Sequence, residues 1–139
     1  MPEIKYLYAG IRVRNLDRSL RFYRALGFKR AYGGTMYHGG KFVHLKCPGS
    51  RAAIELNWYP RGNEFYTPWR SGTEFDHFGF WVGDVDSTLK LIERSGGSVA
   101  VQLDREGTPS TRHVYARDPD GNWLEIMGKW PHNENKKKK

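Results

Sequence analysis

Two glutamates, one histidine and one tyrosine are the residues of this 139-residue sequence best suited to chemistry. Glu55 interrupts the apolar run Ala-Ile-Glu-Leu, and Glu125 interrupts the run Trp-Leu-Glu-Ile. A carboxylate in an apolar strand is costly unless it is paired or binds a metal, although alternation alone could place each glutamate on a solvent face. Glutamate and histidine together suit a borderline divalent ion, and open coordination positions would make that ion catalytic. Glu55, Glu125, His77 and Tyr8 are therefore the candidate site residues.

An internal repeat connects these four residues. The first half of the sequence aligns with the second at an offset of 69 without a gap, which matches Tyr8 with His77. Near the end of each half, Glu55 matches Glu125 at an offset of 70. Two repeated modules are expected to surround a shared cavity, so matched residues would face each other across it.

Each half is predicted to fold as one strand, one helix and three strands. The first helix is expected to begin after an N-cap at Asn15 or Asp17 and to end at Gly27. The second is expected to run from about Asp86 to Ser95. The predicted strands are 6–13, 30–37, 41–47 and 52–58 in the first half and 76–82, 98–103, 112–117 and 122–128 in the second.

The predicted fold class is α+β, with two βαβββ modules whose paired, partly closed mixed sheets surround a central cavity. A single domain is expected over residues 1–139, with modules at about 4–58 and 75–128, a linker at about 59–74 and a flexible lysine-rich tail at 131–139. The linker carries Trp58, Tyr59, Phe65, Tyr66 and Trp69, which could either line an apolar substrate pocket or pack over a barrel end.

Composition narrows the class of protein. The net charge is +8, but Lys136–Lys139 contribute four of these charges, so no basic stripe predicts specific nucleic-acid binding. No run is long and apolar enough to span a membrane, and the start lacks a signal peptide, so a cytoplasmic protein is expected. A single cysteine, Cys47, excludes an internal disulfide and is expected to be a buried thiol. His38, His44, His113 and His132 are expected to be structural or surface residues.

The sequence resembles the vicinal oxygen chelate superfamily of glyoxalases, ring-cleaving dioxygenases and bleomycin- or fosfomycin-resistance proteins. The resemblance runs from about Lys5 to Met127. The resemblance rests on residues 13–28, 53–56, 76–82 and 118–125, and the last of these segments reads Asp-Pro-Asp-Gly-Asn-Trp-Leu-Glu. The ligand positions most resemble those of lactoylglutathione lyases, which carry His or Gln at the position of Tyr8.

The resemblance implies a metal-dependent lyase or isomerase of the glyoxalase I type, acting on a small oxygenated or hemithioacetal substrate through a metal-stabilised enediolate. It implies Glu55, His77 and Glu125 as ligands of one divalent ion, with zinc or nickel expected and cobalt, manganese or iron as alternatives. Glu125 is also implied as the catalytic residue that moves the proton. Tyr8 is expected to bind water or a substrate oxygen. Arg12 is expected to pair with a substrate carboxylate, such as that of a glutathione adduct.

Two alternatives stay open. A binding protein of the bleomycin-resistance type would sequester a small molecule without chemistry, and a ring-cleaving dioxygenase would use histidine where this chain has Tyr8. The asparagine that glyoxalases place after the first glutamate stands in a different register here, at Asn57. A homodimer is expected, because an exposed half-barrel would leave apolar sheet and strand edges uncovered.

Overall fold

The computed structural model describes residues 3, 7–70, 75, 77–103 and 111–131. The chain divides into two compact units, residues 1–73 (unit 1) and residues 74–139 (unit 2). Residues 71–74 of the predicted linker and residues 132–139 of the predicted tail lie outside the described residues. The latter include His132 and Lys136–Lys139. No helix in the described ranges is long and apolar enough to cross a membrane.

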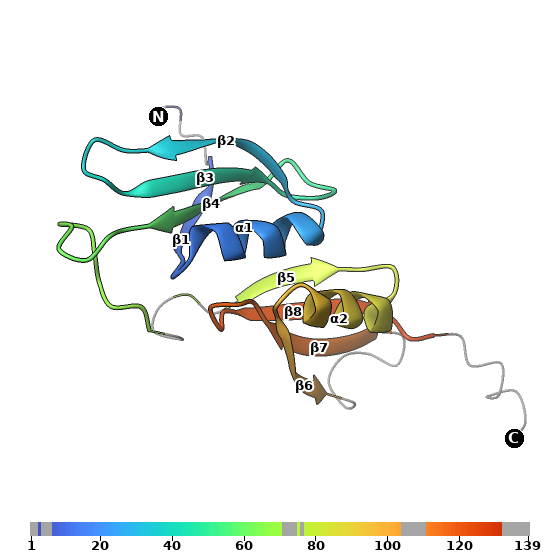
Figure 1. Ribbon diagram of the computed structural model, residues 1–139. Coiled ribbons are helices and arrows are strands. Elements are labelled where there is room, and N and C mark those ends of the chain that lie inside the picture. The colour runs from blue at the N-terminus through green and yellow to red at the C-terminus, as the bar shows by residue number, and fades with distance from the viewer. Residues whose placement is uncertain (1–2, 4–6, 71–74, 76, 104–110, 132–139) are drawn as a thin grey trace, which may run out of the picture. The chain divides into compact units, whose positions relative to one another are not determined.

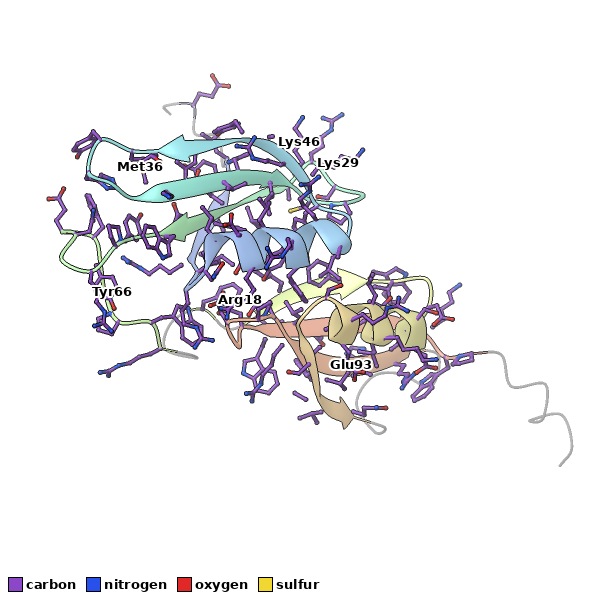
Figure 2. The ribbon with its side chains drawn as sticks, in the orientation of Figure 1. Arg18, Lys29, Met36, Lys46, Tyr66 and Glu93 are labelled. Carbon is purple, nitrogen blue, oxygen red and sulfur yellow. The ribbon has the colours of Figure 1, made fainter. Side chains whose placement is uncertain are left out.

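Unit 1 has the predicted βαβββ order (Figure 1). Its elements are β1 (Ala9–Arg12), α1 (Leu16–Ala25), β2 (Lys29–Thr35), β3 (Lys41–Lys46) and β4 (Ala53–Trp58). The sheet order is β1-β4-β3-β2, with β1 parallel to β4 and the other neighbours antiparallel. The β2–β3 hairpin runs from the Lys29–Lys46 pair at one end to the turn after Met36 at the other (Figure 2).

Unit 2 repeats this arrangement. Its elements are β5 (His77–Trp81), α2 (Val85–Arg94), β6 (Ser98–Leu103), β7 (Thr111–Arg117) and β8 (Trp123–Lys129). The sheet order is β5-β8-β7-β6, again with a single parallel pair, β5 and β8. The prediction of an α+β fold with two βαβββ modules, each forming a four-stranded mixed sheet, is confirmed.

The helices begin and end at matched residues of the repeat. Asn15 Oδ1 accepts a hydrogen bond of 2.9 Å from the backbone N–H of Arg18, so Asn15 rather than Asp17 is the N-cap of α1. Asp84, the repeat equivalent of Asn15, caps α2 in the same way. After the helices, Gly27 and Gly96 have φ of 99° and 97°, a left-handed conformation that favours glycine.

Each helix packs its apolar side against one face of its own sheet. The buried apolar residues of unit 1 are Ile11, Val13, Phe22, Tyr23, Phe28, Val43, Leu45, Ile54 and Leu56. Those of unit 2 are Val85, Leu89, Ile92, Val114, Ala116, Leu124 and Ile126. Because strand side chains alternate, the residues between these core positions lie on the opposite, helix-free face of each sheet. That face carries the candidate site residues.

Candidate functional site

Glu55 lies on the helix-free face of the unit 1 sheet. Its neighbours on β4, Ile54 and Leu56, are buried under α1, and alternation turns the Glu55 side chain to the other face. The side chain is only 14% exposed, so it is not a freely solvated strand glutamate. Its cost of burial must be offset by neighbouring polar groups.

Tyr8 is one of these neighbours. It precedes β1, and its hydroxyl hydrogen-bonds to the Glu55 carboxylate. The negative charge of Glu55 is the main cause that raises the pKa of Tyr8 above its ordinary value near 10; lesser causes are burial, Tyr32 and this hydrogen bond. Tyr8 is therefore a neutral phenol that donates to Glu55, a partner that sequence reasoning did not anticipate.

His44 lies directly beside Glu55 in the sheet, because the two residues are paired across β3 and β4. Its Nδ1 is 3.7 Å from Glu55 Oε2, and this buried nitrogen has no hydrogen-bond partner among the described residues. Tyr32 stacks on the imidazole with ring centroids 4.6 Å apart, and Tyr8 packs edge-on against it at 4.9 Å. These contacts hold the ring beside the carboxylate.

Glu125 is the centre of the corresponding cluster in unit 2. Its Oε2 lies 3.1 Å from His77 Nε2, and its Oε1 lies 3.0 Å from His113 Nδ1. The Glu125 side chain is 16% exposed, and its strand neighbours Leu124 and Ile126 are buried on the helix side. Both carboxylate oxygens thus have an imidazole partner on the helix-free face.

A glycine flanks each glutamate on the neighbouring parallel strand. Gly10 pairs with Glu55, and Gly79 pairs with Glu125. At Gly10 a Cβ would lie 2.9 Å from Asn57 Nδ2, too close without a shift of that side chain. The matched glycines thus place no edge-strand side chain beside either carboxylate, and at Gly79 a Cβ would lie 3.4 Å from Met127 Cε.

His44 and His113 were expected to be structural or surface residues, and the prediction did not include their contacts with the candidate glutamates. Both contact a candidate glutamate on the helix-free face. The sequence carries a signal for them, because they match at the same offset of 69 that aligns Tyr8 with His77. Their registers differ: His44 is paired with Glu55, whereas His113 is paired with Met127 and reaches Glu125 diagonally.

The predicted metal ligands were tested against the geometry of each unit. Two donor atoms bound at about 2.1 Å to one ion lie about 3.0–3.4 Å apart, and the 3.1 Å between His77 Nε2 and Glu125 Oε2 falls in this range. His44 Nδ1 lies beside Glu55 and has no hydrogen-bond partner among the described residues, so this nitrogen is also available as a metal ligand. Carboxylate and imidazole groups of this kind fit a borderline divalent ion.

Neither unit holds a full ligand set within its described residues. No group of three or more histidine, cysteine, aspartate or glutamate side chains in these ranges forms a metal site. The structure brings Tyr8 to Glu55 in unit 1 and His77 to Glu125 in unit 2. The combination of Glu55, His77 and Glu125 around one ion stays a prediction.

Arg12 lies on β1 beyond Gly10 and lines a cavity rather than contacting Glu55. Its Nη1 donates a hydrogen bond to the Phe65 carbonyl, and its guanidinium lies 5.1 Å from the centre of the Tyr59 ring.

Cys47 is half-buried at the end of β3, and burial raises the pKa of its thiol. An unactivated thiol of this kind is a poor nucleophile at neutral pH.

Comparison with known proteins identifies the family that carries this geometry. The profile of the Glyoxalase/Bleomycin resistance protein/Dioxygenase superfamily matches residues 5–126. The chain belongs to this superfamily. The resemblance inferred from the sequence motifs is thereby confirmed.

The chain is also similar to individual members of the superfamily, at identities of about 30% or less. A probable lactoylglutathione lyase of Synechocystis is 31% identical over 127 residues, covering 87% of this chain and 92% of that protein. A lactoylglutathione lyase of Haemophilus influenzae is 29% identical over 130 residues, covering 89% and 92%. A glyoxalase family protein of Bacillus cereus has a solved structure with a TM-score of 0.76 at 14% identity, covering 93% and 96%, which supports the fold alone.

Proposed function

We propose that this superfamily member is a metal-dependent lyase or isomerase of the glyoxalase I type, acting on a small oxygenated or hemithioacetal substrate. The observation that carries the proposal is the His77–Glu125 pair, whose facing donor atoms are 3.1 Å apart while His113 holds the other carboxylate oxygen. The distant lactoylglutathione lyase relatives support the same reaction class.

Glu55, His77 and Glu125 would hold the ion, with zinc or nickel expected and cobalt, manganese or iron as alternatives. A divalent ion, when bound, supplies Lewis acidity toward substrate oxygens and so acidifies the adjacent C–H group. Glu125 Oε2 would take the proton from the substrate carbon once this oxygen no longer binds the ion, and would return the proton to the neighbouring carbon. His113 keeps Oε1 in place during this transfer.

Metal and turnover measurements test the proposal together. Protein purified without chelators should carry close to one equivalent of a divalent metal and should isomerise the hemithioacetal of methylglyoxal and glutathione. Removal of the metal by chelation should abolish turnover, and addition of zinc or nickel should restore it. Metal-free protein that neither takes up added metal nor turns over this substrate would contradict the proposal.

A second candidate function is sequestration of a small molecule without chemistry, as in the bleomycin-resistance members of the superfamily. The observation that favours it is the cavity that Arg12 lines, which lies in unit 1 and needs no metal. Tight ligand binding by a protein that takes up no metal would identify this function. The predicted cytoplasmic location stays a prediction under either function.

Tyr8→Phe should keep the metal and lower kcat/KM about 10-fold, because the variant loses only the hydroxyl that donates to Glu55. Metal content and turnover check this directly. Tyr37→Phe is a matched control, since Tyr37 is 94% exposed on the β2–β3 turn and contacts His38. Loss of metal from Tyr8→Phe would instead make Tyr8 a ligand, and an unaltered variant would make it an ordinary aromatic residue.

A homodimer is proposed as the functional assembly. Each sheet ends in edge strands, β1 and β2 in unit 1 and β5 and β6 in unit 2, and exposed edges favour pairing with a second copy. Large apolar side chains are exposed in both units, namely Leu7, Tyr8, Tyr32, Tyr37, Phe65, Trp81 and Val101. Light scattering should give about twice the 16.1 kDa mass of one chain. The mass of a single chain at micromolar concentration would refute the dimer.

A further inference from the structure

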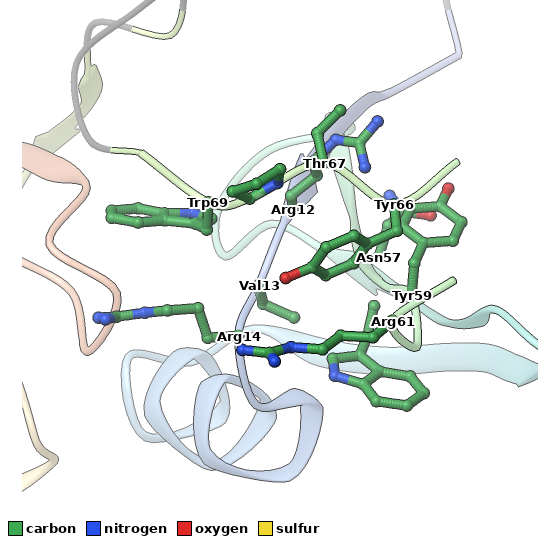
Figure 3. Close-up of a pocket in the computed structure, with 11 residues that line it drawn as sticks. Arg12, Val13, Arg14, Asn57, Tyr59, Arg61, Tyr66, Thr67 and Trp69 are labelled. Carbon is green, nitrogen blue, oxygen red and sulfur yellow. The ribbon is translucent and has the colours of Figure 1, made fainter. Parts of the chain in front are cut away.

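Unit 1 contains a cavity of about 440 Å³ beside the ends of β1 and β4 (Figure 3). Its size falls within the range of small-molecule sites. The cavity lies between these strand ends and the segment 59–69, which in the sequence could equally have been a packing element. The residues that line it are Arg12, Val13, Arg14, Asn57, Trp58, Tyr59, Arg61, Tyr66, Thr67, Pro68 and Trp69.

The lining carries the positive charges of Arg12, Arg14 and Arg61. The described residues of the wall include no aspartate or glutamate. Arg61 has no ion-pair partner in the described part of the chain, and Arg12 is bonded to a neutral carbonyl, that of Phe65. Both Arg12 and Arg61 are exposed, and a guanidinium fork matches a carboxylate with two parallel hydrogen bonds.

The rest of the wall is aromatic. Trp58, Tyr59, Tyr66 and Trp69 contribute flat side chains. Figure 3 shows Arg61 and the Tyr66 hydroxyl extending toward Val13, with Trp69 to one side. Such surfaces bury a planar apolar group and leave the arginines to bind its charge.

The segment that closes the cavity is held in place by its own hydrogen bonds. Asn63 Oδ1 accepts from the Phe65 N–H at 2.9 Å, and the Asn63 carbonyl accepts from the Tyr66 N–H at 2.9 Å. The Asn63 amide donates to the His38 carbonyl, and the Phe65 ring packs against the rings of His38 and Tyr59. These contacts fix the position of the wall, which lowers the entropic cost of binding.

We propose that this cavity binds the anionic group and attached planar ring of a small aromatic carboxylate. Asn57 lies two residues after Glu55 on β4, and Arg12 lies two residues after Gly10 on β1, so the cavity continues the sheet face that carries Glu55.

Calorimetric titration of the full-length, metal-loaded protein tests the proposal with 2-naphthoate and its neutral isostere, 2-naphthamide. Naphthoate should bind at least about 10-fold more tightly than the amide, the scale of one charge-assisted hydrogen bond. Arg61→Gln should remove this preference, whereas Arg21→Gln, on the exposed surface of α1, should keep it. Trp69→Leu should weaken both ligands, because both lose the same aromatic surface.

The outcomes separate this proposal from the proposed reaction. Equal affinity for the two ligands, no saturable naphthoate binding, or an Arg61→Gln variant that binds like the parent would overturn the cavity assignment, whatever the turnover. Selective naphthoate binding by a protein without lyase activity would keep the binding site and remove the proposed reaction. Circular dichroism of each variant checks that the fold is retained.

Discussion

Glu125→Gln is expected to lower kcat/KM for the hemithioacetal by about 1000-fold, within the range for loss of a general acid–base group. The amide keeps the shape of the side chain and an oxygen that can accept from His113, so the fold should survive. It cannot accept a proton from carbon at neutral pH, and it is a weaker metal ligand than a carboxylate. Steady-state kinetics, metal analysis and thermal unfolding measure the three effects separately.

The matched control for this change is Glu93→Gln, on the exposed surface of α2. It removes the same charge from unit 2 without touching the helix-free face, so it should leave turnover and metal content unchanged. Glu125→Gln protein that keeps its metal would assign Glu125 chiefly as the base, and loss of metal would assign it also as a ligand. Turnover within a few-fold of the parent would remove Glu125 from the site.

The other two predicted ligands complete the same experiment. Glu55→Ala and His77→Ala are each expected to lose the metal without unfolding, because their side chains lie on the helix-free face and contribute little to either core. Metal analysis and circular dichroism check each variant. A variant with unaltered metal content would remove its residue from the ligand set.

The elements of the fold could be predicted because each rests on local signals. Helix caps, helix ends and apolar strands recur at offsets of 69 or 70, so each half supports the assignment in the other. The first strand is an exception, since β1 begins at Ala9, after the predicted start, and Tyr8 precedes it. Residue 6, the first of the predicted strand, lies outside the described residues.

The partners of the glutamates could not be predicted in the same way, because they depend on pairing between strands. The loop between the last two strands spans 47–52 in unit 1 and 118–122 in unit 2, one residue shorter. In unit 2 the Asp118 carboxylate accepts from the N–H groups of Asp120 and Asn122, which fixes this tight turn. Histidines matched in sequence therefore occupy different registers, and only the structure shows that both contact a glutamate.

The aromatic linker illustrates the same limit. Its composition fitted either an apolar substrate pocket or packing over a barrel end, and in the structure one part of it lines a cavity while another part packs on neighbouring rings. Tyr66 and Trp69 line the cavity, whereas Phe65 packs on His38 and Tyr59. Arg12 was expected to bind a substrate carboxylate by resemblance, and its place in a cavity lined by other arginines supports that role on independent grounds.

His113→Leu is expected to weaken metal binding and lower kcat/KM together, each by about 100-fold. The variant removes the 3.0 Å hydrogen bond that holds Glu125 Oε1, so the carboxylate is free to rotate away from His77. In the proposed reaction, His113 does not contact the substrate and acts only by positioning Glu125. His113→Gln, whose amide N–H can donate to the same oxygen, should recover most of both losses.

His44→Leu is the matched control for the His113 experiment. His44 also lies beside a candidate glutamate, but its Nδ1 is 3.7 Å from Glu55 and makes no hydrogen bond within the described residues. We therefore expect its replacement to change metal affinity several-fold less than His113→Leu does. Competition with a chelator measures the metal affinity of all three variants. Equal losses in His113→Leu and His113→Gln would show that the ring acts by packing, because a lost hydrogen bond would be restored by the amide.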